Sequence, residues 1–144
     1  MSNPGAKRWL TMAVLAGAAY LAIGVAPAAL AGAATSDQMR EFWNVSAFVV
    51  CGIVFVAHMA HEHFQLRSNA RLMAWHTATG VALGGLGLAL VANIHDLGSA
   101  SGYRPRMLVA LVAWPLLTAA PAFVVAWALA TGLRAMRIPR RELP

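Results

Sequence analysis

The sequence predicts an all-α integral membrane protein in which four transmembrane helices form an antiparallel up-down-up-down bundle. Three observations lead to this fold class: 60% of the 144 residues are apolar, only 11 are basic and 5 acidic, and the charges avoid four long apolar runs. A soluble domain of this size exposes much of its surface and needs charged residues to cover it. We therefore expect one transmembrane domain over residues 1–144, surrounded by the lipid bilayer.

The four apolar runs lie at residues 9–34, 43–63, 72–95 and 107–133. Each is near or above the roughly 17 residues that a helix needs to cross the hydrocarbon core. Helices are expected because a segment inside the bilayer must satisfy its own backbone hydrogen bonds. The second run reaches its full length only if its last two turns, which contain three histidines and a glutamate, lie at or inside the interface.

The first run also has features of a secretory signal peptide. Lys7 and Arg8 precede it, and small residues at 26–34 offer cleavage sites. The apolar stretch is longer than the usual core of a signal peptide, so we expect a retained helix.

Orientation follows from the distribution of basic residues. One side of the predicted bundle holds eight of the eleven: Lys7, Arg8, Arg67, Arg71, Arg134, Arg137, Arg140 and Arg141. The other side holds Arg40, Arg104 and Arg106, which Asp37, Glu41 and Asp96 balance. Because basic loops stay in the cytoplasm, both termini are expected there. An abundance of Ala and Arg favours a bacterial source, and with it the inner membrane.

Several functional classes are excluded or disfavoured. The basic residues flank apolar runs and form no stripe or known motif, which argues against binding of nucleic acid. The single cysteine, Cys51, cannot form a disulfide within the chain and is expected to be a small buried apolar residue. Residues 61–65 read His-Glu-His-Phe-Gln and so lack the H-E-x-x-H motif of metalloproteases. No motif establishes an enzymatic activity.

Ionisable residues cluster where the second run ends and the third begins. His58, His61 and Glu62 close the second run, and His76 opens the third at a similar depth in an antiparallel hairpin. Polar groups in a spanning helix are expected to face the bundle, so His58 and His76 should approach each other. The sequence predicts haem b between them, with these two imidazoles as axial ligands and Arg67 or Arg71 near the propionates.

Glycines on the third run provide a face for close approach. Gly80 and Gly84 follow His76 at helical spacing, with Gly87 one turn later. A small-xxx-small step of this kind admits either another backbone or a flat ligand such as haem. Gly80 and Gly84 are therefore included among the predicted cofactor-binding residues.

Other interpretations of the histidine cluster remain open. His58, His61 and His76, with Glu62, could bind a non-haem metal ion, or His58, Glu62 and His76 could form a proton relay. The histidines could also simply bond headgroups and loop carbonyls. In that case the chain would be an accessory subunit of a larger membrane complex, or a homo-oligomer, without a cofactor of its own.

A second polar group is expected on the opposite side of the bundle. His95, Asp96, Tyr103 and Arg104 gather there near Trp43 and Asn44. This mixture suits the headgroup of a quinone, but ordinary loop chemistry explains it equally well.

Overall fold

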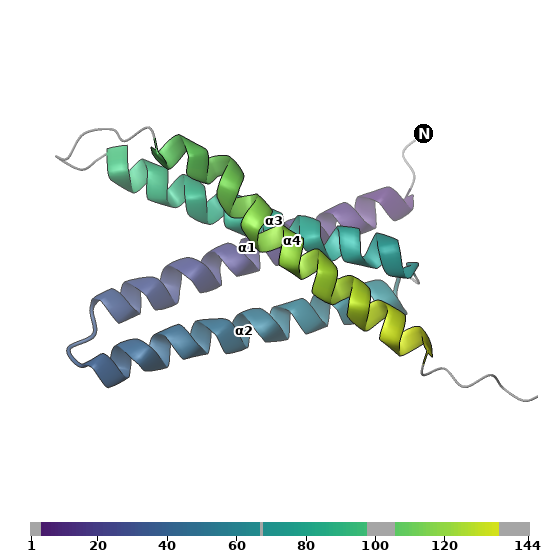
Figure 1. Ribbon diagram of the computed structural model, residues 1–144, viewed down its shortest axis with the longest axis horizontal. Coiled ribbons are helices and arrows are strands. Elements are labelled where there is room, and N and C mark those ends of the chain that lie inside the picture. The colour runs from purple at the N-terminus through teal and green to yellow at the C-terminus, as the bar shows by residue number, and fades with distance from the viewer. Residues whose placement is uncertain (1–3, 67, 98–105, 136–144) are drawn as a thin grey trace, which may run out of the picture.

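The computed structural model describes residues 4–66, 68–97 and 106–135, and every regular element in this part of the chain is a helix (Figure 1). The helices are α1 (Pro4–Gly32), α2 (Asp37–Phe64), α3 (Ala70–Leu97) and α4 (Arg106–Ala135). Each contains a segment of 26 to 28 residues that is long and apolar enough to cross a membrane. The prediction of an all-helical protein with four such helices is confirmed.

All four helices begin earlier than the predicted apolar runs, and polar caps set the first turns of α2 and α3. The Ser36 hydroxyl accepts a 3.2 Å hydrogen bond from the backbone N–H of Met39, so α2 starts six residues before the predicted run. The Asn69 side chain likewise accepts a 2.8 Å bond from the Leu72 N–H at the start of α3. Capping satisfies amide groups that a helix start leaves unpaired. Hydropathy therefore locates the apolar centre of each helix but not its ends.

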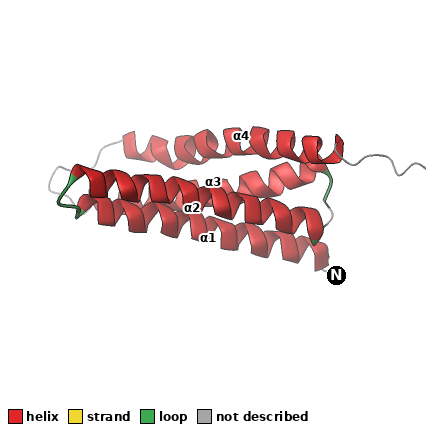
Figure 2. Cartoon of the chain, turned by 90° about the horizontal axis from the view of Figure 1, so that it is seen from below, coloured by secondary structure: helices red, strands yellow, loops and turns green. Residues whose placement is uncertain are grey.

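Successive helices run in opposite directions, and α3 lies between α1 and α4 (Figures 1 and 2). The closely packed pairs are α3 with α4, α1 with α3, and α1 with α2. The short turn between α2 and α3 predicts that these helices are neighbours, yet they diverge from that turn (Figure 1). They meet only at what we call the basal end, where α1 and α3 begin and α2 and α4 end.

Glycines explain why α3 packs against α1. A Cβ atom added to Gly84 would lie 2.5 Å from Tyr20 Cβ, and one added to Gly17 would lie 2.7 Å from Leu83 Cβ and 3.2 Å from the Gly80 carbonyl oxygen. The backbones of α1 and α3 are thus too close for larger residues at these positions, as in small-residue contacts between membrane helices. The glycine face of α3 receives a neighbouring helix along this interface.

A buried apolar cluster joins α2, α3 and α4 near the basal end. Its members are Met59, Met73, Ala74, Ala126 and Ala130. Beside it, the rings of Trp75 and Phe123 lie 5.2 Å apart and link α3 to α4. This cluster fixes the last turns of α2 near α3, which is where the predicted histidine site lies.

Candidate functional site

A buried carboxylate connects α2 to α3 at the basal end. Glu62 is 0% exposed, and its Oε2 lies 2.8 Å from Nδ1 of His76. The Ser68 hydroxyl donates a second bond of 2.9 Å to the same oxygen. Because a carboxylate oxygen accepts, Nδ1 of His76 is the donor in this pair. Glu62 therefore holds the imidazole in a defined orientation with Nε2 on the opposite edge of the ring.

The first helix covers one face of the His76 ring. The Trp9 indole stacks on it with ring centroids 4.4 Å apart and planes inclined by 4°. A stacked indole covers the face of an imidazole and leaves its edge, where the ring nitrogens lie, to other partners. The sequence does not indicate this role for Trp9, because a tryptophan near the end of an apolar run is equally typical of the membrane interface.

His58 lies one helical turn before Glu62 and is 3% exposed. Its ring packs against Gly80 of α3, where an added Cβ would lie 3.0 Å from Cε1 and 3.3 Å from Nδ1 of the imidazole. Neither ring nitrogen has a hydrogen-bond partner among the described residues. His58 and His76 thus both adjoin Glu62 in the buried space between α2 and α3.

Several buried polar atoms of α2 and α3 lack a hydrogen-bond partner among the described residues. Besides both nitrogens of His58, they include Oε1 of Glu62 and the hydroxyl of Thr77, within the described part of the chain. A buried polar atom left unpaired costs about 1–3 kcal/mol. Buried polar groups in folded proteins nearly always have partners, so these atoms are available to water, an ion or another molecule. Thr77 was not singled out from the sequence, since a lone threonine on a spanning helix usually bonds its own backbone.

The other two basal histidines lie outside this buried cluster. His61 is half-buried and borders a cleft of about 390 Å³ between α1 and α2, together with Lys7, Arg8 and Gln65. His63 faces a different, apolar recess between α2 and α4, and its ring meets Phe64 edge-on at 5.0 Å. In residues 4–66, 68–97 and 106–135, no three His, Cys, Asp or Glu side chains are arranged to hold a metal ion.

The structure also shows which side chains lie against the two predicted cofactor-binding glycines. Gly80 adjoins the His58 ring and Ala16 of α1, and Gly84 adjoins Tyr20 of α1. The sequence allowed either a neighbouring helix or a flat ligand on this face. In the structure the partner is a helix, α1. The glycines therefore set the distance between α1 and α3 and bring Ala16 toward the histidine cluster.

The polar group predicted at the opposite end falls partly outside the described residues. Tyr103, Arg104 and the Asp96 side chain lie outside them, as does Arg67 at the basal end. His95 is exposed on the last turn of α3. Comparison of the chain with protein-family models, with curated proteins and with solved structures found no match. The case for a function therefore depends on the geometry of the basal cluster.

Proposed function

We propose that the chain is a multi-pass protein of a bacterial inner membrane, with both termini in the cytoplasm. The length and apolar character of all four helices support this proposal. Lys7, Arg8, Arg71 and Arg134 all belong to the basal ends of their helices, as expected for the cytoplasmic side. The basal cluster then lies just inside the cytoplasmic leaflet.

Labelling with a membrane-impermeant maleimide tests this orientation. Cys51 is the only cysteine, so a Cys51→Ser background allows single cysteines at exposed turn positions. Thr35→Cys, in the turn between α1 and α2, should react in intact spheroplasts. Gln65→Cys, at the basal end, should react only after the membrane is opened. The reverse pattern, or equal labelling of both positions, would contradict the proposed orientation.

We further propose that the basal cluster binds haem b through His58 and His76, making the protein a small electron carrier. The observation that carries this proposal is the pairing of a buried, unpartnered imidazole with one whose Nδ1 is fixed by a carboxylate. Histidines that ligate a metal through Nε2 commonly donate their other N–H to a carboxylate or carbonyl. Two neutral imidazoles from different helices suit a b-type haem, which would supply one-electron chemistry when bound.

The contacts of α1 restrict where the macrocycle would lie. Ala16 and Tyr20 already fill the face of α3 that carries Gly80 and Gly84, so that face leaves no space for a flat ring. The nearby cleft between α1 and α2 is lined by Lys7, Arg8 and His61, but neither His58 nor His76 is part of its lining. Lys7 and Arg8 join Arg67 and Arg71 as candidates to pair with the propionates. A haem held by His58 and His76 would require the first turns of α1, including Trp9, to shift.

An optical spectrum of the purified full-length chain tests the haem proposal. We expect a reduced-minus-oxidised spectrum typical of a haem with two histidine ligands, after expression with ample haem precursor. His58→Ala and His76→Ala should each lose bound haem, whereas the matched variants His61→Ala and His63→Ala should retain it. Wild-type protein with native helicity by circular dichroism but without haem would overturn the proposal.

A different observation favours a second candidate, an accessory subunit without a cofactor. The apolar recess between α2 and α4 has a volume of about 370 Å³ and is lined by residues such as Met59, Phe64 and Leu133. These helices are not a closely packed pair, so a partner's transmembrane helix would bury apolar surface there. Native electrophoresis in mild detergent discriminates: comigration with larger proteins supports a subunit role, and a free monomer argues against it.

A further inference from the structure

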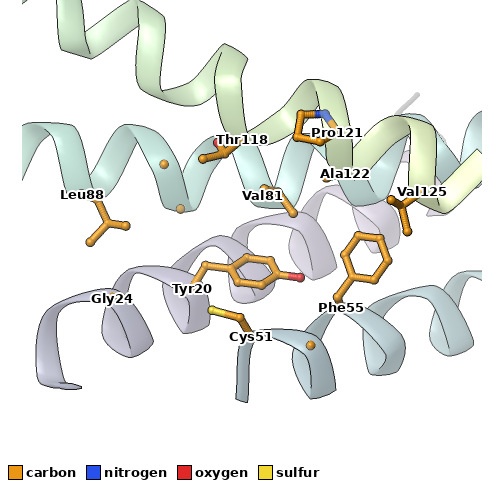
Figure 3. Close-up of a pocket in the computed structure, with 13 residues that line it drawn as sticks. Tyr20, Gly24, Cys51, Phe55, Val81, Leu88, Thr118, Pro121, Ala122 and Val125 are labelled. Carbon is orange, nitrogen blue, oxygen red and sulfur yellow. The ribbon is translucent and has the colours of Figure 1, made fainter. Parts of the chain in front are cut away.

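A cavity of about 410 Å³ lies between all four helices, away from the histidine cluster. Tyr20 of α1, Cys51 and Phe55 of α2, and Val125 of α4 point into it, and the glycines of α3 form part of its wall (Figure 3). Its volume is within the range of about 300–1,000 Å³ that is typical of small-molecule sites. The lining is almost entirely apolar, so an occupant must be a hydrophobic molecule.

One polar group in this apolar lining lacks a partner. Tyr20 is 8% exposed, and its hydroxyl has no hydrogen-bond partner among the described residues. Figure 3 shows this hydroxyl directed into the cavity. The other hydroxyl in the wall, on Thr118, already donates to carbonyls of its own helix, at 2.9 Å and 3.1 Å. An occupant of the cavity should therefore offer a hydrogen-bond acceptor to Tyr20.

The position of Tyr20 along α1 restricts the source of that acceptor. The residue lies midway along the apolar segment Lys7–Gly32, so in the proposed membrane arrangement its hydroxyl is near the bilayer centre. The ester carbonyls of phospholipids lie at the interface, about 15 Å away, because the hydrocarbon core is about 30 Å thick. An acyl chain alone has no acceptor. The occupant must be a hydrophobic molecule that brings its own hydrogen-bond acceptor into the hydrocarbon core.

Access to the cavity is available from the membrane. Its walls include Gly52 on α2 and Ala122 on α4, and these two helices are not closely packed on each other. A molecule dissolved in the bilayer can therefore approach between them. On the α1 side, Gly84 allows the base of the Tyr20 side chain to lie directly against the α3 backbone.

We propose that this cavity binds the ring of a membrane-dissolved quinone, with the Tyr20 hydroxyl donating to one quinone carbonyl. Quinones combine a flat hydrophobic ring, carbonyl acceptors and free diffusion within the bilayer. The inference uses only the membrane location from the proposed function and is independent of haem. It differs from the polar group near His95, because it places the ring in the middle of the bundle.

Two substitutions, Gly52→Leu and Tyr20→Phe, test the space in the cavity and the hydrogen bond separately. An added Cβ at Gly52 meets nothing within 4 Å, so Gly52→Leu should fill part of the cavity without displacing a helix. Gly132 of α4 is equally open and lies outside the cavity wall, so Gly132→Leu is the matched control. Tyr20→Phe keeps the ring and removes only the hydroxyl donor.

Protection of Cys51 provides the readout. This half-buried thiol lines the cavity and is the only one in the chain, so its rate of reaction with N-ethylmaleimide reports occupancy. The probe is decyl-ubiquinone, whose fully substituted ring does not add thiols, with full-length protein in nanodiscs of a single synthetic phospholipid. We expect saturable protection for the wild-type chain and Gly132→Leu. Tyr20→Phe should need about 3- to 10-fold more quinone, as expected for one hydrogen bond, and Gly52→Leu at least about 10-fold more.

Three outcomes would overturn the proposal. The first is no protection of wild-type Cys51 at any quinone concentration. The second is equal protection of wild type and Tyr20→Phe. The third is equal protection by decylbenzene, which has a similar shape but no carbonyl and would identify the cavity as a site for acyl chains. Maleimide labelling at Thr35→Cys and Gln65→Cys tests membrane insertion separately, so failure of that premise is recognised independently.

Discussion

His76 and Glu62 are fourteen residues apart in sequence, on two helices that diverge, and yet Nδ1 of the imidazole lies 2.8 Å from Oε2 of the carboxylate. This pair is the main polar link between α2 and α3. The Ser68 hydroxyl, from the turn between them, bonds the same oxygen. The Arg134 guanidinium of α4 donates to the Ser68 carbonyl at 3.2 Å, so the link extends to the end of α4.

Replacing Glu62 should destabilise the basal end. Glu62→Ala leaves the His76 N–H and the Ser68 hydroxyl without their acceptor, and we expect the free energy of unfolding to fall by about 2–4 kcal/mol. Glu62→Gln keeps an acceptor oxygen and should cost about 1 kcal/mol. Unfolding by sodium dodecyl sulfate, followed by circular dichroism, measures both. Glu41→Gln, at an exposed position of α2, should have no effect; equal loss at both positions would contradict this role for Glu62.

Trp9 should stabilise the fold through its contact with His76. Trp9→Ala removes a parallel stack, which is worth about 0.5–1.5 kcal/mol beyond the apolar area it buries. Trp9→Phe should restore part of that loss. The control is Trp127→Ala, which removes an indole that is half exposed on α4. If both alanine variants unfold at the same detergent fraction, the stack does not contribute to stability.

The approach of α1 to α3 should not tolerate even a methyl group. In Gly84→Ala the new Cβ would meet Tyr20 Cβ at 2.5 Å and the Gly17 carbonyl oxygen at 3.3 Å, so the helices must separate. We expect a loss of about 1–3 kcal/mol, typical of overpacking. Gly132→Ala, where nothing lies within 4 Å of the added carbon, should be neutral or slightly stabilising because alanine favours a helix. Similar stability of the two variants would be inconsistent with the close contact.

Removing the Tyr20 hydroxyl should not destabilise the ligand-free chain. Because the hydroxyl is buried without a partner, Tyr20→Phe should leave stability unchanged or raise it by up to about 1 kcal/mol in quinone-free detergent. Tyr20→Ala also removes the ring that packs on Gly84 and should cost about 3 kcal/mol. A marked loss of stability in Tyr20→Phe would show that the hydroxyl already has a partner within the protein.

The number and approximate centres of the helices could be predicted because long apolar runs with few charges have few other stable structures. The pairing of the helices could not. Gly80 and Gly84 indicate that some surface comes close to α3, but a glycine carries no information about which helix supplies it. The short turn after α2 suggested α2, whereas Gly17 and Tyr20 of α1 have the complementary shape.

The candidate site, too, could be predicted only in part from the sequence. The position of His58 and Glu62 in a spanning helix predicted that they face the bundle, because polar and charged groups avoid lipid. The Trp9 stack and the Tyr20 cavity depend on the angle between α1 and α3, which only the packed structure gives. His61 and His63, close neighbours in sequence, point into separate spaces because successive helical residues face different directions.

The contact between α1 and α3 has a consequence for biosynthesis. The surface of α1 that carries Gly17 and Tyr20 has its partner on a helix that is translated only after α2 is complete. The first hairpin is therefore synthesised before its tightest contact can form. That contact becomes available only when α3 has been made, so a delay in synthesis after α2 would leave α1 without one of its main packing partners.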